Sequence, residues 1–394
     1  MTKMKLWQRG GGIDRRIEKF TVGSDPELDL ELVEYDCRAS IAHARMLRTI
    51  GILSAVESRQ LAAELGKIIT LNREKQFRIR VEEEDCHTAI ENHLVRRLGA
   101  TGKKIHAGRS RNDQVLTAIR LYSKDRLNHI KDSLGRLMGN LNRMSRKYRN
   151  APIPGYTHSR KAMPYSVGRY FRAFEDAFKD DLLLLESAGR INDQNPLGSA
   201  AGFGTSLELN RDLTTRLLGF RKTQENELYA QNSRGKFESI ILFALSQVML
   251  DLQRLAADLV LFSMEEFGFF HLPEEFCTGS SIMPQKRNPD VLELVRANFA
   301  VVHSGYLRVM EILKGLPSGY HRDLQLTKEP LIRGFRETLT TIEIMCLVLA
   351  GLKVNEDTCR QACTDEIYAA DRAHELVRKG AAFRDAYRAV ARKL

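Results

Sequence analysis

A long run of apolar residues, spaced three and four positions apart, constrains the fold more than any other feature. This spacing places the side chains on one face of a long amphipathic helix, and no strand-like alternation competes with it. The run consists of Leu127, Ile130, Leu134, Leu137, Met138, Leu141 and Met144. Two further stretches, residues 239–262 and 331–352, are apolar on most sides, as expected at the centre of a bundle or at a subunit interface. We therefore expect an all-α fold, a long-helix bundle.

Prolines are sparse, with 10 in 394 residues, and they gather in short segments that we expect to be loops. These segments are residues 152–154, 164, 196, 273–289 and 317–330. A chain of this length exceeds what one hydrophobic core usually fills. We expect an N-terminal helical domain at residues 1–106, a central long-helix bundle at 107–353 and a small C-terminal helical domain at 354–394.

The charge balance favours an anionic partner. The chain has 61 basic and 50 acidic side chains, a formal net charge of +11, which suits a polycarboxylate or a nucleic acid. Nucleic-acid binding would need a clustered basic face or an aromatic stacking platform. The charges here are spread along the chain, so we expect no nucleic-acid partner.

The composition predicts a cytoplasmic protein without a membrane partner. Six scattered cysteines favour reduced thiols. The N-terminal segment MTKMKLWQRGGG lacks the apolar stretch of a secretory signal. The most apolar run, residues 240–245, is halted at Ser246, Gln247 and Asp251, short of the roughly 18 residues that a membrane span requires. We expect this run to be buried in a protein core.

The segment HAGRSRNDQ leads straight into the long helix, with Ser110 and Asp113 at capping-box spacing. The start of a helix offers unpaired N–H groups. Beside that positive helix end, Arg109, Arg111 and Asn112 can hold a carboxylate through bidentate and amide hydrogen bonds. The alternative is a plain helix cap with solvated arginines.

Two further segments offer proton-transfer groups. In PGYTH, a turn projects His158 next to Thr157; histidine titrates near neutrality and can move protons, although a lone histidine is more often structural. The segment TGSSIMPQKRNPD precedes a helix that carries Glu293. We expect it to be a mobile loop that closes over substrate and brings Ser280 and Lys286 to the reacting centre, the alternative being a polar surface loop.

A fourth segment, residues 315–330, is a long polar insertion from which Tyr320, Gln325 and Lys328 can point into one cleft. The glycine-rich NPLGSAAGFGT lacks the G-x-G-x-x-G spacing and the preceding strand of a dinucleotide site. The His/Glu cluster between His87 and His93 matches no metal-ligand pattern. We therefore expect neither a cofactor nor a metal.

Taken together, these segments resemble the signature regions of the fumarase/aspartase superfamily of helical lyases. The string GSSxMPxKxNP is shared by the whole superfamily, whereas GRSRNDQ and DLQxxKEP are similar to its argininosuccinate lyase branch. KLW near the N-terminus and DCHTAIE, which contains His87, fit the same branch. The resemblance spans most of the chain.

The resemblance implies a homotetramer whose long helices form a central bundle, with each active site assembled from loops of three subunits. It also implies reversible β-elimination of argininosuccinate to arginine and fumarate, without a cofactor. Ser280 would exchange the proton at the succinyl β-carbon, and His158, oriented by Glu293, would have the opposite proton role; which of the two is the base stays open. Lys286 and Asn288 would stabilise the developing negative charge. The substrate would be bound by Arg111, Asn112, Thr157, Asn288, Tyr320, Gln325, Lys328 and His87.

Several positions depart from the pattern of this branch. Gly23 stands where a substrate-binding serine is usual, Ala107 replaces a threonine, and Ser159 and Arg160 follow PGYTH in place of the usual leucine and glutamine. The chain also stops soon after RAHELVRKG, where relatives continue, so we expect an abbreviated C-terminal domain. The alternatives are a lyase of the same mechanism that acts on another succinyl adduct, such as adenylosuccinate, or a non-catalytic crystallin-like homologue.

Overall fold

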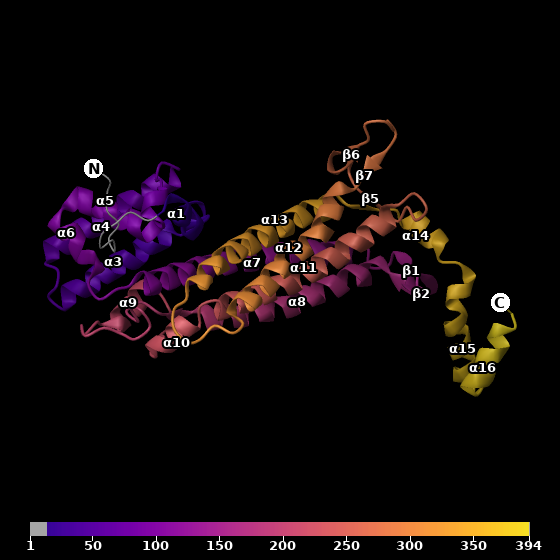
Figure 1. Cartoon of the computed structure of the whole chain (residues 1–394). Coiled ribbons are helices and arrows are strands. Elements are labelled where there is room, and N and C mark those ends of the chain that lie inside the picture. Colours follow the sequence, from indigo (N-terminus) through magenta and orange to yellow (C-terminus); the bar gives the residue numbers. More distant parts are fainter. Residues whose placement is uncertain (1–13, 394) are drawn as a thin grey trace. The chain divides into compact units, whose positions relative to one another are not determined.

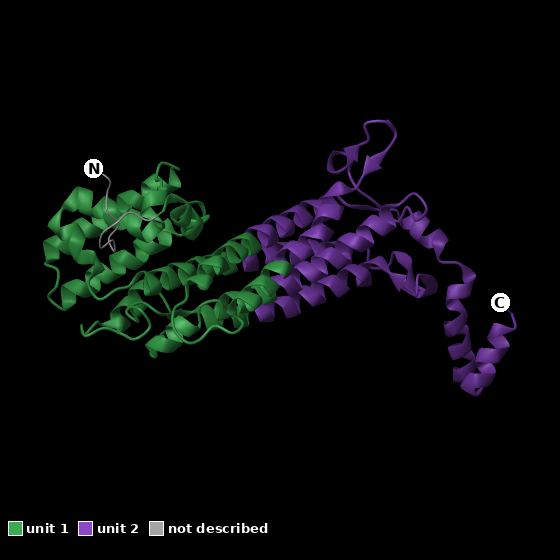
Figure 2. Ribbon diagram, in the orientation of Figure 1, with its two compact units in different colours: residues 1–129, 185–243, 304–335 green, residues 130–184, 244–303, 336–394 purple. Residues whose placement is uncertain are grey.

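The computed structural model describes residues 14–393, and these are mostly helical, with a few short strands (Figure 1). KLW lies outside the described residues. The chain divides into two compact units of three stretches each (Figure 2). Unit 1 comprises Met1–His129, Leu185–Phe243 and Ser304–Phe335, and unit 2 comprises Ile130–Leu184, Ala244–His303 and Arg336–Leu394. The three domains expected from the sequence remain a prediction.

Five long helices run through the chain. They are α7 (Arg111–Lys147), α8 (Val167–Asn192), α11 (Lys236–Ser263), α12 (Asp290–Leu313) and α13 (Lys328–Gly351). The helix predicted from the apolar run is confirmed as α7: Leu134, Leu137 and Leu141 are 0% exposed. The two all-round apolar stretches are confirmed as α11 and α13. Each of the five helices begins in one unit and ends in the other.

Unit 1 adds shorter helices to parts of these long ones. They are α1 (Arg15–Val22), α2 (Asp25–Leu28), α3 (Val33–Thr49), α4 (Ala55–Arg73), α5 (Cys86–Leu98), α6 (Ala100–Lys103), α9 (Arg211–Leu218) and α10 (Glu227–Asn232). Strands β3 (Gln194–Asn195) and β4 (Lys222–Thr223) pair in parallel. Helices α3, α4 and α5 bury a common apolar core that includes Leu47, Leu65 and Leu94.

Unit 2 contains three antiparallel strand pairs, and the first and last of them lie where the sequence predicted loops. They are β1 (Pro152–Thr157) with β2 (Arg160–Ser166), β5 (Phe270–His271) with β8 (Lys353–Val354), and β6 (Thr278–Gly279) with β7 (Arg287–Asn288). Its last helices are α14 (Glu356–Ala362), α15 (Ala369–Arg378) and α16 (Phe383–Ala391). In β1, Pro152 and Pro154 lie within a two-stranded ladder, which gives every strand a free edge and tolerates proline.

The last proline-marked segment, residues 317–330 in unit 1, is also less irregular than expected. Residues Arg322–Thr327 form a 3-10 helix, and α13 begins directly after it at Lys328. Pro330 therefore lies in the first turn of α13 rather than in a loop. A proline is tolerated there because the first N–H groups of a helix have no partner within the helix.

One stretch, Glu227–Ser263, is long and apolar enough to cross a membrane by length and composition alone, with a mean hydropathy of 1.5 in its most apolar window. Of that window, 56% is buried inside the protein. Within α11, Leu245, Val248 and Leu252 are 0% exposed. This burial marks α11 as a core helix, in agreement with the expectation from sequence.

Candidate active site

Six of the predicted site residues line one pocket in unit 1. The N-terminal turn of α7 contributes Arg111 and Asn112, and α5 contributes His87. Tyr320, Gln325 and Lys328 come from the polar segment that ends at the start of α13. The expectation that these last three side chains point into one cleft is confirmed. The pocket is also lined by Val22, Asp25, Glu84, Asp85, Val115, Arg234 and Arg322.

Lys328 is a buried charge of the pocket, with a side chain that is 3% exposed. Its Nζ lies 2.7 Å from Asp25 Oδ2 and 2.6 Å from Asp29 Oδ1. Burial by itself would lower the pKa of Lys328, but the two carboxylates outweigh it and raise that pKa. Burial and the neighbouring Asp29 raise the pKa of Asp25 to about 6, although Lys328 opposes this. Lys328 is therefore a firmly protonated cation.

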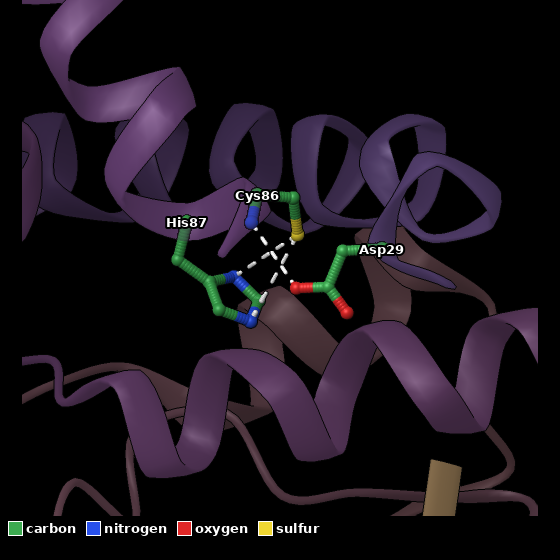
Figure 3. A group of neighbouring side chains, drawn as sticks. All are labelled: Asp29, Cys86 and His87. Atoms are coloured by element: carbon green, nitrogen blue, oxygen red, sulfur yellow. Dashed lines mark hydrogen bonds between the residues drawn. The ribbon is translucent and has the colours of Figure 1, made fainter. Parts of the chain in front are cut away.

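Behind Lys328, donor atoms of Asp29, Cys86 and His87 lie within 4.8 Å of one another, a grouping of metal-ligating side-chain types (Figure 3). The backbone N–H of Cys86 donates to Asp29 Oδ2 at 3.1 Å. A metal ion there would compete with the ammonium of Lys328 for Asp29. The Lys328 ammonium therefore already supplies the positive charge that Asp29 needs.

His87 is buried and paired with a carboxylate. Its Nδ1 lies 3.1 Å from Asp36 Oδ2, and both side chains are at most 3% exposed. Burial lowers the pKa of His87, but Asp36, with help from Asp85 and Asp29, outweighs burial and raises that pKa. Asp36 therefore favours the protonated form of His87, whose ring lies close to Asp29, the partner of Lys328.

The two arginines of GRSRNDQ lie in different surroundings. Arg111 donates from Nη1 to Glu84 Oε2 at 3.1 Å and to Asp85 Oδ2 at 2.9 Å, and it lines the pocket. Arg109 instead turns into the core, where it is 8% exposed and donates to Ser40 Oγ at 2.8 Å. Of the two arginines expected to hold a carboxylate, the structure brings only Arg111 to the pocket.

Asp113 anchors the start of α7. Its Oδ1 accepts from the backbone N–H of Ser110 at 2.9 Å, the expected capping interaction. Its Oδ2 accepts from the N–H groups of Gly198 at 2.8 Å and Ala200 at 3.1 Å. The glycine-rich segment NPLGSAAGFGT, which the sequence excluded as a dinucleotide site, thus binds a carboxylate of the chain itself. This contact positions Arg111 and Asn112, which precede Asp113.

Gln325 is held by the chain segment that contains the Gly23 departure. Its Nε2 donates to the carbonyl oxygens of Thr21 at 3.0 Å and Val22 at 3.2 Å. Gly23 has a φ of +58°, and a Cβ at this position would lie 3.8 Å from Gln325 Nε2. A side chain at position 23 would thus contact a pocket residue, but the left-handed backbone disfavours any residue other than glycine.

The other six predicted residues lie in unit 2, on two hairpins and one helix. Thr157 ends β1, and His158 and Ser159 form the two-residue loop before β2, with φ values of +51° and +56°. Two positive φ values are typical of the tight turn that joins twisted strands. The tip of this hairpin presents His158 to solvent.

The predicted loop residues Ser280, Lys286 and Asn288 belong to the β6–β7 hairpin. Ser280 Oγ accepts from the backbone N–H groups of Met283 at 3.1 Å and Ile282 at 3.4 Å. Asn288 Nδ2 donates to the carbonyl oxygen of Gly279 at 3.4 Å, and Lys286 is exposed. The hairpin places Ser280 where two amide N–H groups point at its hydroxyl oxygen.

One chain does not bring these unit 2 residues together. Figure 1 shows the β1–β2 and β6–β7 hairpins at separate places in unit 2. Among the described residues, no hydrogen bond or ion pair joins His158 to Glu293, and both side chains are exposed. The orientation of His158 by Glu293 thus remains a prediction.

Inspection of the sequence missed the acidic residues that hold the pocket's cations. Asp25 and Asp29 pair with Lys328, and Glu84 and Asp85 pair with Arg111. The runs SDPELDLE and EEED were visible as local excesses of acid. Their partners lie far away in the chain, so only the fold reveals the pairing.

Comparisons with known proteins identify the family of this chain. The sequence model of a family described as Lyase matches residues 10–303. The argininosuccinate lyase of Thermotoga neapolitana is 47% identical, over 99% of this chain and 98% of that protein. The argininosuccinate lyase of Sorangium cellulosum is 45% identical, over 99% of this chain and 91% of that protein. A crystal structure of EDDS lyase in complex with formate has a TM-score of 0.82 and 25% identity, over 97% of this chain and 76% of that chain. The chain therefore belongs to the fumarase/aspartase family of lyases, within its argininosuccinate lyase branch.

Proposed function

We propose that this protein cleaves argininosuccinate reversibly into L-arginine and fumarate by β-elimination. One observation carries the proposal: the pocket of unit 1 brings together Arg111, Asn112, Tyr320, Gln325 and Lys328, the residues that the resemblance places around this substrate. The pocket has cationic groups for carboxylates and acidic groups for a guanidinium. A substrate that carries both kinds of charge fits this lining.

Ser280 is the proposed base at the succinyl β-carbon. A serine hydroxyl is a weak base in water, so its alkoxide needs stabilisation. The N–H groups of Met283 and Ile282 point at Ser280 Oγ, and hydrogen bonds to the charged form lower a pKa. Loop closure over the substrate would add the exclusion of water that strengthens these interactions.

Removal of the proton leaves a carbanion next to a carboxylate, and the added negative charge is delocalised onto the carboxylate oxygens. Lys286 and Asn288 are the proposed donors to that carboxylate, and one such preorganised donor is worth about 3 kcal/mol of transition-state stabilisation. His158, at the hairpin tip, is the proposed acid that protonates the departing guanidino nitrogen. Thr157 is the proposed substrate contact beside it. The C–N electron pair leaves with the nitrogen, so fumarate and arginine form without any redox change.

The proposed active form is a homotetramer in which loops of three subunits meet at each site. The exposure of His158, Lys286 and Glu293 in the single chain supports this, because the reaction needs a dry site. Apolar side chains on the long helices are also exposed, including Leu183 at 60%, Leu294 at 65% and Leu347 at 58%. Burial of such side chains against other copies is the usual role of an all-round apolar helix. The six cysteines are free thiols, which supports the cytoplasm as the proposed location.

The test is to follow fumarate by its ultraviolet absorbance with argininosuccinate, adenylosuccinate and aspartate as parallel substrates. Fumarate from argininosuccinate alone supports the proposal. Fumarate from another adduct supports the same elimination mechanism with a different substrate, and would assign the change in specificity to the departures at Gly23 and Arg160. No fumarate from any of the three, by a folded tetramer, overturns the proposal and favours a non-catalytic homologue.

A further inference from the structure

A cavity of about 590 Å³ lies in unit 1 between α3, α4 and α9. Helix α3 contributes Arg45 and Arg48, α4 contributes Arg59 from its second turn, and α9 contributes Leu213 and Leu217. Among the described residues, this arginine cavity shares no lining residue with the candidate active-site pocket. A ligand of the arginine cavity would therefore occupy a separate site.

The lining of the arginine cavity is cationic. Its three guanidinium groups face no lining carboxylate among the described residues. All three side chains are exposed, and in the part of the chain that the structure describes none of the three guanidinium groups has a hydrogen bond or an ion pair. Arg45 and Arg48 are also three positions apart on α3, a spacing at which like charges repel. The charge of this cavity is thus left uncompensated, which favours an anionic ligand.

The lack of partners is confined to the cavity. The neighbouring helices α3, α4 and α5 carry four other arginines, and each of them pairs with a carboxylate at an N···O distance between 2.6 and 3.7 Å. These are Arg38, Arg73, Arg96 and Arg97. Unpaired surface arginines are therefore not a general property of this part of unit 1. They gather at the one place on these helices where a cavity is present.

Glu57, two positions before Arg59, is committed to other groups. Its Oε2 accepts from the backbone N–H of Ser54 at 2.8 Å, and its Oε1 lies 2.5 Å from Nζ of Lys104. These contacts hold the pKa of Glu57 at about 2, with the hydrogen bond from Lys104 as the largest cause. The carboxylate nearest in sequence to Arg59 thus already has a cation, and the arginines of the cavity are left for a ligand.

Hydroxyl groups in the lining leave the guanidinium groups as the free donors. Ser58 and Thr49 each donate to a carbonyl oxygen of α3, at 3.2 and 2.7 Å. The side-chain donors available to a ligand are therefore the three planar forks of the arginines, which match groups with several acceptor oxygens. Phosphate is such a group, because it can accept bidentate hydrogen bonds from more than one arginine.

Helix α9 gives the arginine cavity an apolar wall. This helix packs against α3, and its Leu217 is 39% exposed although it is apolar. Leu213 lines the same wall. A volume of about 590 Å³ lies within the usual range of small-molecule sites and leaves room for more than a phosphate group. The wall can therefore contact an organic part of the ligand.

We infer that the arginine cavity binds a small phosphate ester, with its phosphate on Arg45, Arg48 and Arg59 and its organic part against Leu213 and Leu217. The unpaired guanidinium groups account for the phosphate, and the exposed leucine beside them accounts for the ester. The inference does not rest on the proposed function, because the cavity contains none of the residues assigned to catalysis or substrate binding.

The experiment measures the binding of pyrophosphate, ADP and citrate by isothermal titration calorimetry on the full-length protein. Pyrophosphate carries the phosphate groups alone, ADP adds an organic part, and citrate supplies negative charge without phosphate. Arg48→Gln and Arg59→Gln each remove one guanidinium group. Arg73→Gln is the matched control, because it removes the same charge from α4 outside the cavity. Leu217→Ser alters only the apolar wall.

The wild type is expected to bind pyrophosphate saturably and ADP more tightly, with citrate weaker than both. Arg48→Gln and Arg59→Gln should each weaken the binding of pyrophosphate and ADP about tenfold, whereas Arg73→Gln should leave both unchanged. Leu217→Ser should weaken ADP but not pyrophosphate. Circular dichroism checks that each variant is folded.

Three results would overturn the inference. Neither phosphate compound binds the wild type, or the two cavity variants bind them as the wild type does, or Arg73→Gln weakens binding as much as Arg59→Gln does. Citrate that binds as tightly as pyrophosphate would exclude phosphate as the group recognised, and equal losses of ADP and pyrophosphate in Leu217→Ser would exclude the organic part. Fumarate release by the wild type decides the proposed function separately.

Discussion

The pocket of unit 1 and the hairpins of unit 2 hold their candidate side chains in opposite ways. In the pocket, Lys328 is 3% exposed and lies between two carboxylates. On the hairpins, His158 and Lys286 are exposed, without a hydrogen bond to another side chain among the described residues. The binding groups are thus preorganised within one chain, whereas the proton-transfer groups are not.

This difference follows from what each group must do. A buried cation is stable only when carboxylates compensate its desolvation, so the pocket can be complete in an isolated chain. A proton-transfer group that is exposed to solvent has no desolvation penalty until other surfaces cover it. If subunits meet around the substrate, the exposed hairpins become the dry half of each site. Changes in the pocket and changes on the hairpins should therefore affect binding and turnover separately.

The largest effect is expected for Ser280→Ala. Loss of the proposed base should lower turnover by about a thousandfold or more, with the substrate still bound. Steady-state fumarate release gives the rate, and calorimetry with argininosuccinate gives the affinity. Near-normal turnover would remove Ser280 from the mechanism.

His158→Asn should have the next largest effect. A general acid contributes about 10²–10⁴ in rate, and asparagine keeps the positive-φ backbone of the turn. Ser159→Ala is the matched control on the same turn and should retain most of the activity. A variant at position 158 that keeps its rate would reassign the protonation of the leaving nitrogen.

Lys328→Met tests the contribution of the buried ammonium group to the pocket. Removal of the ammonium leaves the buried Asp25 and Asp29 uncompensated, which should cost about 3–5 kcal/mol of stability and raise KM. Adding Asp29→Asn should restore part of the stability but not the substrate affinity. Recovery of both would show that Lys328 only neutralises its neighbours.

Mixing the Lys328→Met and Ser280→Ala proteins tests directly whether the pocket and the hairpin of one site come from different copies. If a site takes its pocket from one copy and its hairpin from another, reassembled mixtures contain some sites with both residues intact. Activity should then return from two inactive proteins. Mixtures that stay inactive after exchange of subunits would show that each site is built by one chain.

The sequence predicted the elements of this comparison better than their contacts. Apolar spacing was sufficient for α7, α11 and α13, because at least one face of each helix is buried in the core. The prolines of β1 were interpreted as marking loops, and the two-residue turn at His158 and Ser159 lacks the usual Asn-Gly signal. The hairpin was therefore missed.

Contacts between distant residues were out of reach for a physical reason. Asp29 and Lys328 are 299 positions apart, and Asp113 and Gly198 are 85 apart. Propensity and periodicity report only on near neighbours, so neither pairing leaves a local pattern. The motifs located Lys328 and the start of α7 but not the groups that hold them.

Asp113→Asn tests one of these distant contacts. Its carboxylate accepts from three backbone N–H groups, and an amide cannot accept all of them because one of its two heavy atoms is a donor. We expect a loss of about 1–3 kcal/mol in stability and a higher KM through Arg111 and Asn112. Asp132→Asn, an exposed change on the same helix, should be neutral. If Asp113→Asn and Asp132→Asn had equal effects, Asp113 would not anchor the start of α7.

The smallest effect is expected at Asp181 on α8, which is buried in a different way from the acids of the pocket. The pocket pairs its buried carboxylates with cations, whereas Asp181 is 4% exposed and its Oδ2 has no hydrogen-bond partner among the described residues. Burial, with the nearby carboxylates of Asp251 and Asp180, raises the pKa of Asp181 to about 7. Since the folded pKa lies above the unfolded value of about 4, folding is favoured by the bound proton, and this contribution is lost as the pH rises through the folded value.

Asp181→Asn should therefore remove a fall in stability that the wild type shows between pH about 4 and about 7, and stabilise the protein by about 1–2 kcal/mol at neutral pH. Chemical denaturation across this pH range measures the difference. Asp180→Asn, an exposed neighbour on the same helix, should change the curve much less. If the Asp181→Asn curve instead runs parallel to that of the wild type, a cationic group must compensate Asp181 in the assembled protein. Asp181 would then be buried as the acids of the pocket are, with the cation supplied by another copy.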